Sequence, residues 1–338
     1  MMGLSAKIRL SPIGFIVVGL CGLALVYYLT TDGNETGHSG ESVSIKQLLA
    51  ASIQLAEDGG IAVRTVREQN NLSEKSKGKT KEGVNDPVTQ GDLQSHRAMF
   101  YGFRKAFPSV KVVSEEHEAS AAPEDTTSPK LSSATILLNN ELQNIEDEYV
   151  PVSNVLVWID PLDATKEYTE NLLHFVTTMV CIVVNGKPVA GVIHKPFQKK
   201  SFWAWNGHGS SSNLNSKESV TKSDMSSPRI IISRSHAGKV NATARKAFGG
   251  KAVVIPAGGA GYKVLSLFDG SADAYVHVTK IKKWDICAGD AILRALGGRM
   301  TTLKGDDIIY TDPSKPANDQ GLLAALRNHK EFRRMLKL

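Results

Sequence analysis

The spacing of apolar residues predicts two helices in the first part of the chain. Between residues 44 and 66 apolar residues recur near a 3.6-residue period, which is typical of an amphipathic helix. A second amphipathic helix follows Asp92 and ends at Pro108. The polar residues 71–84 between these helices are predicted to form a loop, and a short strand is expected at 110–113.

The middle and the end of the chain predict a layered α/β fold. Three apolar segments predict an antiparallel meander in which Asn185 and Gly186 form a hairpin turn; the segments are 175–184, 188–194 and 201–205. Strands and helices then alternate, at 229–233, 238–248, 252–255, 262–268, 274–278 and 286–296. Mixed sheets between pairs of helices are therefore expected, with loops at strand ends to carry the chemistry and no second domain.

An uncharged apolar run at residues 13–29 predicts a membrane anchor. Lys7 and Arg9 precede it, so residues 1–12 should be a cytoplasmic tail and the rest of the chain should face the lumen. A cleaved signal peptide is the alternative, but no small-x-small cleavage site follows the run. Residues 30–43 would then be a lumenal stalk, before one domain at 44–338.

Two further features bear on this topology. Asn71 and Asn241 each begin an Asn-x-Ser/Thr sequon, which glycosylation could use in a lumenal domain. Residues 119–150 have the composition of an insertion, and their first half is predicted to be a mobile loop.

Charge and cysteine usage exclude some classes of protein. The net charge is +6, part of it in a lysine run at 75–81 that lacks interleaved aromatic residues, so a solvated loop is expected there and no nucleic-acid partner. Of the three cysteines, Cys21 lies in the apolar N-terminal run, while Cys181 and Cys287 lie in apolar surroundings typical of packed thiols. There is no zinc spacing, and a bridge between the last two stays open.

The segment 158–168, WIDPLDATKEY, carries the strongest chemical signal. Asp160 and Asp163 flank Pro161 after an apolar run, and we expect the buried strand to end at residue 159, because proline cannot donate to the ladder. Thr165 adds a hydroxyl near a helix start. Carboxylates, a hydroxyl and a helix N-terminus at one point are typical of a metal-assisted phosphate site.

Acidic residues occur at the ends of several predicted elements. They are Asp92, Glu115, Asp160, Asp163 and Asp285. No histidine or cysteine cluster accompanies them, so an all-oxygen set favours Mg²⁺, with two or more ions. Each acid alone would suit a helix cap or a turn, and spacing does not show that they meet.

Four ordered motifs resemble those of the inositol monophosphatase family, the lithium-sensitive, magnesium-dependent phosphatases. They are DPVTQGD at 86–92, SEE at 114–116, DPLDAT at 160–165 and WDICAG at 284–289. The resemblance spans residues 44–335. It implies the αβαβα sandwich that is called inositol monophosphatase/fructose-1,6-bisphosphatase-like.

The resemblance also implies roles for individual residues. Glu115, with Glu116 as its alternative, Asp160, Asp163, Asp285 and the carbonyl of Leu162 would hold the metals. Asp92 and Thr165 would orient and deprotonate the attacking water, and the amides after Asp163 would receive the phosphate. Ala164 stands where the family usually has glycine, and alanine is tolerated there if the backbone conformation is ordinary.

Finer resemblance concerns the substrate. TKEY at 165–168, SRSH at 233–236 and GAGYK at 259–263 are similar to the nucleotide-phosphatase branch, which removes the 3′-phosphate from adenosine 3′,5′-bisphosphate. Carried over, the nucleotide contacts would be Ser233, His236, Gly259 and Lys263. With its anchor, the chain resembles the Golgi-resident members of this branch, which would clear the nucleotide by-product of lumenal sulfotransferases. The family often forms dimers, so a homodimer stays open.

Two other functions remain as alternatives. One is an inositol phosphate or polyphosphate phosphatase on the same fold, which a substrate panel would separate. The other is a non-catalytic nucleotide-binding protein of the lumen, against which the complete set of acidic residues and Thr165 argues.

Overall fold

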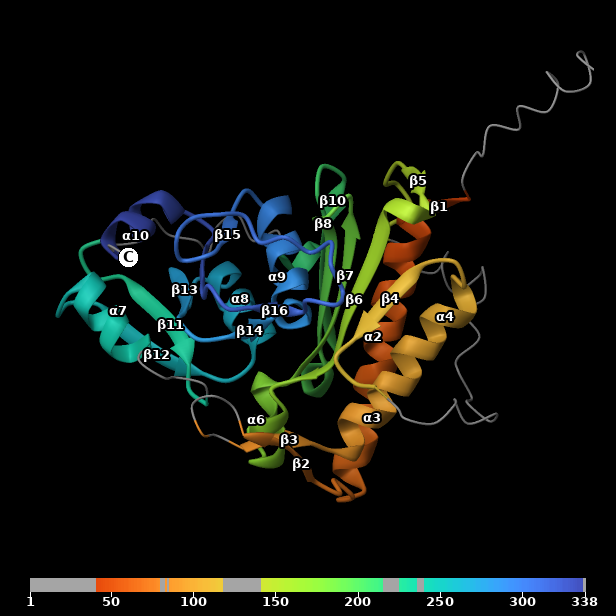
Figure 1. The fold of residues 1–338 in the computed structure, drawn as a ribbon, viewed down its shortest axis with the longest axis horizontal. Coiled ribbons are helices and arrows are strands. Elements are labelled where there is room, and N and C mark those ends of the chain that lie inside the picture. The colour runs from red at the N-terminus through yellow and green to blue at the C-terminus, as the bar shows by residue number, and fades with distance from the viewer. Residues whose placement is uncertain are drawn as a thin grey trace, which may run out of the picture. The chain divides into compact units, whose positions relative to one another are not determined.

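Helices and sheets alternate in layers through the described part of residues 43–336 (Figure 1). The computed structural model describes residues 41–79, 83, 85–117, 141–214, 225–235 and 240–336. One helical layer covers the outer face of the first sheet, a second lies between the two sheets, and a third covers the outer face of the second sheet. The αβαβα sandwich implied by the sequence motifs is confirmed.

The first sheet has six strands in the order β10-β9-β8-β7-β6-β4. Neighbours are antiparallel apart from β4 and β6, which run parallel. The strands are β4 (Lys111–Ser114), β6 (Val155–Asp163), β7 (Thr177–Val184), β8 (Lys187–Lys195), β9 (Lys200–Trp205) and β10 (Gly209–Ser210). The predicted meander is confirmed as β7, β8 and β9, and Asn185 and Gly186 both adopt the positive φ of the hairpin turn.

The second sheet has five strands in the order β12-β11-β13-β17-β15. Its first three strands are parallel and its last two join antiparallel. The strands are β11 (Arg229–Ser233), β12 (Val253–Ala257), β13 (Ala274–His277), β15 (Arg299–Thr301) and β17 (Leu322–Ala325). β15 and β17 were not predicted, because short buried strands have no periodic pattern.

The helices fall into three groups. On the outer face of the first sheet lie α2 (Ile45–Glu68), α3 (Gln90–His96) and α4 (Gly102–Ala106), with a π-helical turn (Arg97–Tyr101) joining the last two. Between the sheets lie α8 (Ala260–Phe268) and α9 (Lys283–Ala295). On the outer face of the second sheet lie α7 (Val240–Phe248) and α10 (His329–Leu336). All of these helices except α10 were predicted.

The remaining short elements surround these layers. They are β1 (Ser42–Ser44), β2 (Lys75–Lys79), β3 (Asn85–Val88), β5 (Tyr149–Pro151), α6 (Thr165–Thr169), β14 (Ile281–Lys282) and β16 (Ala317–Asn318). The loop predicted at 71–84 is therefore wrong in part, because β2 pairs antiparallel with β3 across a bulge. In β2 lysine alternates with small residues, which is compatible with an exposed strand. Polarity alone does not distinguish such a strand from a loop.

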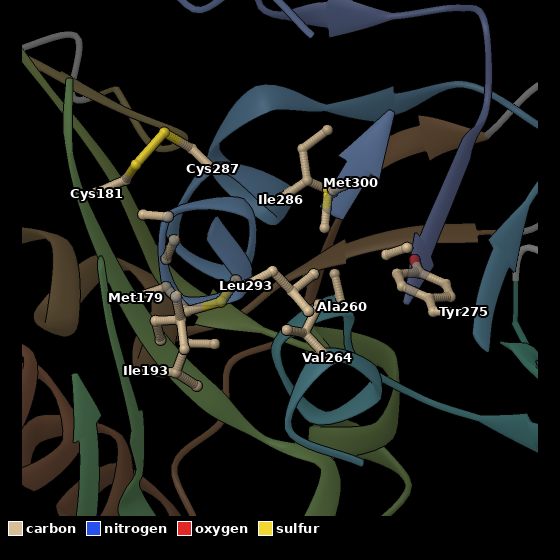
Figure 2. Close-up of a cluster of buried hydrophobic side chains, with 14 of the residues drawn as sticks. Met179, Cys181, Ile193, Ala260, Val264, Tyr275, Ile286, Cys287, Leu293 and Met300 are labelled. Atoms are coloured by element: carbon tan, nitrogen blue, oxygen red, sulfur yellow. A yellow bond between two sulfur atoms is a disulfide. The ribbon is translucent and has the colours of Figure 1, made fainter. Parts of the chain in front are cut away.

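The main core lies between the two sheets, where α8 and α9 pack (Figure 2). Met179 and Ile193 from the first sheet face Val264 of α8 and Leu293 of α9, and all four are at most 1% exposed. Each such side chain contributes about 1.5–3 kcal/mol on burial. α9 approaches β8 so closely that a Cβ at Gly191 would lie 2.3 Å from the carbonyl oxygen of Ala288, which requires glycine there.

The predicted anchor, tail and most of the stalk lie outside the described residues, as do residues 118–140 of the predicted insertion. Among the helices that the structure describes, none is both long enough and apolar enough to cross a membrane.

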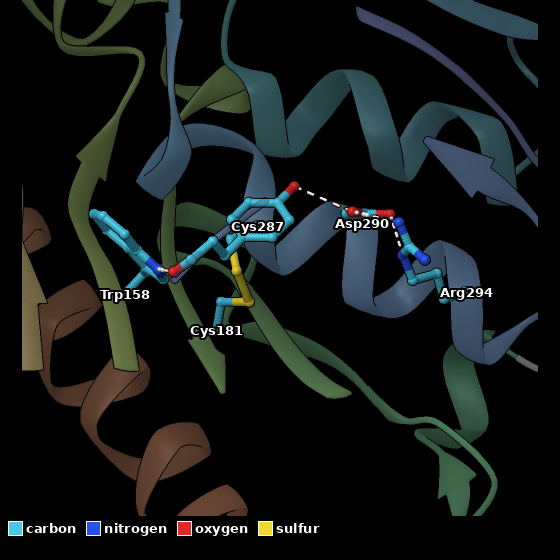
Figure 3. Close-up of a disulfide and its surroundings, with 6 residues drawn as sticks. Trp158, Cys181, Cys287, Asp290 and Arg294 are labelled. Atoms are coloured by element: carbon cyan, nitrogen blue, oxygen red, sulfur yellow. Dashed lines mark hydrogen bonds and ion pairs between the residues drawn. A yellow bond between two sulfur atoms is a disulfide. The ribbon is translucent and has the colours of Figure 1, made fainter. Parts of the chain in front are cut away.

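A hydrogen-bonded chain crosses the core beside α9 (Figure 3). The indole Nε1 of Trp158 donates to the carbonyl oxygen of Tyr310, 3.2 Å away, and the Tyr310 hydroxyl donates to Asp290 Oδ2 at 3.1 Å. Arg294 Nε donates to Asp290 Oδ1 at 2.8 Å. Asp290 is completely buried, and burial raises the pKa of its carboxyl to about 6 although Arg294 lowers it.

This pKa predicts a pH-dependent term in stability. In the unfolded chain Asp290 loses its proton at about pH 4, whereas in the folded protein it keeps the proton up to about pH 6. Above about pH 6 the buried carboxylate is ionised, which destabilises the fold. The cost begins to fall as the pH drops through the folded pKa and is gone below the unfolded pKa of about 4. We expect the unfolding free energy of wild type, relative to Asp290→Asn, to rise by about 2 kcal/mol between about pH 7.5 and about pH 4.5.

Denaturant unfolding of the full-length chain at both pH values measures this difference. Asp307→Asn is the matched control, because Asp307 also lies near Arg294 but its side chain is 53% exposed. The prediction would be contradicted if the unfolding free energies of wild type and of Asp290→Asn changed by the same amount between the two pH values.

Candidate functional site: an acidic cleft at the end of β6

A cleft of about 900 Å³ brings together most of the residues that the sequence singled out. Its walls come from both sheets and from α6, α8 and α9. The predicted residues that line it are Glu115, Asp160, Leu162, Asp163, Thr165, Ser233, Gly259, Lys263 and Asp285. Asp92 lies behind Thr165, and His236 lies outside the described residues.

Three carboxylates converge in the cleft. Glu115 follows β4, Asp160 lies in β6 and Asp285 lies in the first turn of α9, and their oxygens lie within 4.8 Å of one another. Burial and then mutual repulsion raise the pKa values of Asp160 and Asp285 well above the usual range for aspartate. A cation bound between them would remove this repulsion.

The conformation of β6 corrects one prediction. The strand does not end at residue 159; it continues to Asp163, and its pairing with β7 shifts register between Asp160 and Asp163. This bulge accommodates Pro161, because the extra residue needs no ladder hydrogen bond. Asp160 Oδ1 accepts a hydrogen bond from the Leu162 amide at 3.2 Å, which supports the bulged backbone.

Asp163 joins β6 to the N-terminus of α8. Its Oδ1 accepts from the amide of Ala260 at 3.0 Å, and its Oδ2 accepts from the amide of Gly261 at 2.8 Å and from Thr177 Oγ1 at 3.0 Å. A carboxylate is favoured there by the helix dipole. Asp163 lines the cleft but is not a member of the 4.8 Å group, and both of its oxygens accept amides of α8.

A hydrogen-bonded pair lies beside the carboxylates. Thr165 Oγ1, at the start of α6, donates to Asp92 Oδ1 at 2.9 Å and also lies 3.2 Å from the Leu162 carbonyl. The amide and hydroxyl of Thr89 donate to Asp92 Oδ2 at 2.7 and 2.6 Å, which fixes Asp92 in the capping box of α3. Burial raises the pKa of Asp92 to about 7, although the bonds from Thr89 and Thr165 lower it.

Lys77 is a site residue that sequence reasoning missed. Its ammonium donates to Glu115 Oε1 at 2.9 Å and also pairs with Glu116, the alternative ligand. The lysine run was predicted to be solvated. Only the pairing of β2 with β3 directs this side chain toward β4, so composition could not identify it.

Two buried donors were also missed. Among the described residues, the Tyr275 hydroxyl and the Trp284 Nε1 have no hydrogen-bond partner, and both residues line the cleft. The WD pair of the fourth motif was a signal for Trp284. No local signal distinguishes Tyr275 from any other strand tyrosine.

The residues assigned to the nucleotide form another wall. Lys263 is 3% exposed, its ammonium pairs with the Gly259 carbonyl, and it lies 5.2 Å from the ring centroid of Tyr275. Gly259 has φ of 63°, and a Cβ there would lie 2.7 Å from the Phe175 carbonyl oxygen. Ser233 ends β11 and is 4% exposed.

Arg234 connects this wall to α6. Its Nη1 lies 3.2 Å from Glu167 Oε1 and 2.6 Å from Glu170 Oε2. The end of β11 is thereby held beside the helix that carries Thr165.

Alanine would be tolerated at position 164 in an ordinary backbone conformation, but Ala164 does not have one. Its φ and ψ are 72° and 44°, in the left-handed region that glycine adopts freely. The turn from β6 into α6 requires this conformation whichever residue occupies it.

Replacing Ala164 with glycine should therefore stabilise the protein. The left-handed conformation costs a non-glycine residue roughly 1–2 kcal/mol, which glycine avoids. Glycine also raises the conformational entropy of the unfolded chain, and this offsets part of the gain in stability. We expect Ala164→Gly to raise the unfolding free energy by about 1 kcal/mol, measured by denaturant titration of the full-length chain. Ala62→Gly, inside α2, is the matched control and should lower it by about 1 kcal/mol. A loss of stability in both variants would refute the argument.

The chain is similar to known proteins along almost its whole length. The model of the inositol monophosphatase family matches residues 44–335. A Danio rerio protein named inositol monophosphatase 3 is 47% identical, over 98% of this chain and 97% of its own. A human protein named Golgi-resident adenosine 3′,5′-bisphosphate 3′-phosphatase is also 47% identical, over 97% of this chain and 96% of its own.

Solved structures confirm the fold. The extragenic suppressor protein suhB from Bartonella henselae superposes with a TM-score of 0.62 at 21% identity, covering 86% of this chain and 98% of that protein. CysQ from Bacteroides thetaiotaomicron superposes with a TM-score of 0.57 at 22% identity, covering 84% and 99%. On the sequence matches and the shared fold together, the chain belongs to the inositol monophosphatase family.

Proposed function

We propose that this chain is a magnesium-dependent phosphatase that hydrolyses the 3′-phosphate of adenosine 3′,5′-bisphosphate, yielding AMP and phosphate. The observation that carries the proposal is the convergence of Glu115, Asp160 and Asp285 within 4.8 Å, beside the hydrogen bond from Thr165 to Asp92. Relatives from several mammals that bear the name of this activity, at 46–47% identity, support the substrate.

The residues of the cleft fit a hard divalent cation. All of the donors are oxygens, and Glu115 with Glu116 already attracts a cation, the ammonium of Lys77. Glu115, Asp160 and Asp285 would hold Mg²⁺, and Asp163 and the Leu162 carbonyl would complete the ligands for two or more ions. When bound, such ions neutralise the phosphate and lower the pKa of water.

The chain's own residues would then move the proton. The attacking water gives its proton to Thr165 Oγ1, and Thr165 passes its own proton to Asp92 Oδ1, 2.9 Å away. The bond from phosphorus to the ribose 3′-oxygen breaks as the new bond to the water oxygen forms, and the leaving 3′-oxygen takes a proton from water. A pKa of about 7 at Asp92 suits a general base near neutral pH. The amides at the start of α6 would hold the phosphate oxygens, since unpaired helix N–H groups favour anions.

The remaining wall would bind the nucleoside part. Lys263, Ser233 and Gly259 line the same cleft as the carboxylates, and a volume of about 900 Å³ is ample for a nucleotide. Lys263 supplies a buried cation for a second phosphate, which an inositol monophosphate lacks. The predicted role of His236 stays a prediction.

Substitutions at the pair and at the carboxylates test the mechanism. In the full-length chain, Thr165→Val should lower kcat for adenosine 3′,5′-bisphosphate by about 10²–10⁴-fold, because the water loses its proton acceptor. Asp160→Asn should abolish magnesium-dependent phosphate release. Asp312→Asn, at an exposed acid outside the cleft, is the control and should keep full activity.

The substrate is tested in the same assay with inositol 1-phosphate, with magnesium or a chelator, and with lithium as the expected inhibitor. A preference for inositol 1-phosphate would support the metal site but contradict the assignment of Ser233, Gly259 and Lys263 to the nucleotide. Folded, magnesium-loaded protein that hydrolyses neither compound would favour a nucleotide-binding protein instead.

A Golgi location, as a single-pass protein with a lumenal catalytic domain, is part of the proposal. The uncharged residues 13–29 and the preceding Lys7 and Arg9 support the anchor and its orientation. The Cys181–Cys287 disulfide in the core supports an oxidising compartment. A homodimer is an expectation from the family alone.

Glycosylation tests this orientation. Asn71 and Asn241 are exposed, so a lumenal domain would present both sequons to the glycosylation machinery. We expect a glycosidase-sensitive mass shift that the double substitution Asn71→Gln/Asn241→Gln removes, and protection of the domain from protease added to intact Golgi vesicles. An unglycosylated domain that the protease digests in intact vesicles would reverse the topology.

A further inference from the structure

The disulfide Cys181–Cys287 joins β7 to α9 across the core, over a sequence separation of 106 residues (Figure 3). The two cysteines are 1% and 0% exposed. No reductant reaches either sulfur without opening the core, so the bond acts as a permanent cross-link rather than as a switch.

The cross-link lies next to both ends of the acidic group. Cys181 is directly opposite Trp158 in the β6–β7 ladder, and Asp160 lies two residues further along β6. On the other side, Cys287 lies two residues after Asp285 in α9. One covalent bond therefore connects the neighbourhood of Asp160 to that of Asp285.

The separation of Asp160 and Asp285 depends on how α9 lies against β6, because the two carboxylates come from these two elements. The close packing of Ala288 on Gly191 and the contact between the rings of Trp158 and Trp284, 6.2 Å apart, hold the helix in place without a covalent bond. Both contacts would weaken with a small shift of α9, whereas a disulfide tolerates little movement.

We propose that the Cys181–Cys287 disulfide is a positioning element of the metal centre, which holds Asp160 and Asp285 at the separation that a divalent cation requires. The inference rests on the proposed metal-dependent function. Without the bond, α9 is free to shift against β6 before a cation binds, and binding must bring the two carboxylates back to the required separation. Magnesium affinity therefore depends on the disulfide more strongly than turnover at saturating magnesium does.

The test compares the full-length wild type with Cys181→Ala/Cys287→Ala. Magnesium affinity is measured by calorimetry and by the rise of the melting temperature with magnesium, so neither readout depends on turnover. Substitution of groups that support metal ligands commonly costs 10–100-fold in affinity, and we expect the affinity to fall by about tenfold. kcat at saturating magnesium should stay within about threefold of wild type.

A second variant separates positioning from global stability. Phe332→Ala removes a fully buried ring of the outer helical layer, which lies in a different core cluster, and should also lower the melting temperature. Its magnesium affinity should equal that of wild type. Equal losses of affinity in Phe332→Ala and in the double cysteine variant would overturn the inference, since the disulfide would then act only through stability.

Two further outcomes complete the test. Alkylation of the unfolded, unreduced protein should modify Cys21 alone, and modification of Cys181 and Cys287 would overturn the inference. A wild type that binds magnesium but hydrolyses no phosphate ester would contradict the proposed function. The magnesium affinities of wild type and the variants would still decide the role of the disulfide. A wild type that binds no divalent cation would overturn both.

Discussion

Repulsion among closely spaced carboxylates is the constraint on which the site and much of its scaffold depend. Glu115, Asp160 and Asp285 come from three separate elements and hold their oxygens within 4.8 Å of one another. At this distance two ionised groups repel by roughly 3–4 kcal/mol if the effective dielectric constant is near 20. A fold with a total stability of about 5–15 kcal/mol supports such a group only on a rigid scaffold, and burial together with this repulsion raises the pKa values of Asp160 and Asp285.

The scaffold supplies compensation from helix N-termini. Asp92 and Asp285 occupy the third position of α3 and α9, where each accepts a backbone hydrogen bond from its own cap, and Asp163 accepts two amides of α8. Each N-terminus brings a partial positive charge to the cleft. The layered arrangement is what allows these helices, which lie on different faces of the sheets, to point toward one place.

Local strain collects at the same point. Ala164 adopts a left-handed conformation between Asp163 and Thr165, and Gly259 faces it with another positive φ. Both conformations let the backbone turn sharply at the end of β6 and at the start of α8, so that side chains on either side reach the cleft. Strained backbone at such a position agrees with a binding site, which the surrounding packing must maintain.

Much of this protein follows from local sequence. The meander, α2, α8 and α9 could be predicted because periodicity, turn residues and capping act over a few neighbouring positions, and the motifs singled out the acidic residues from Asp92 to Asp285. The tertiary structure alone decided which donors meet, that Lys77 reaches Glu115, and that Cys181 pairs with Cys287. These contacts depend on the packing of segments far apart in the chain, and no local pattern encodes how such segments meet.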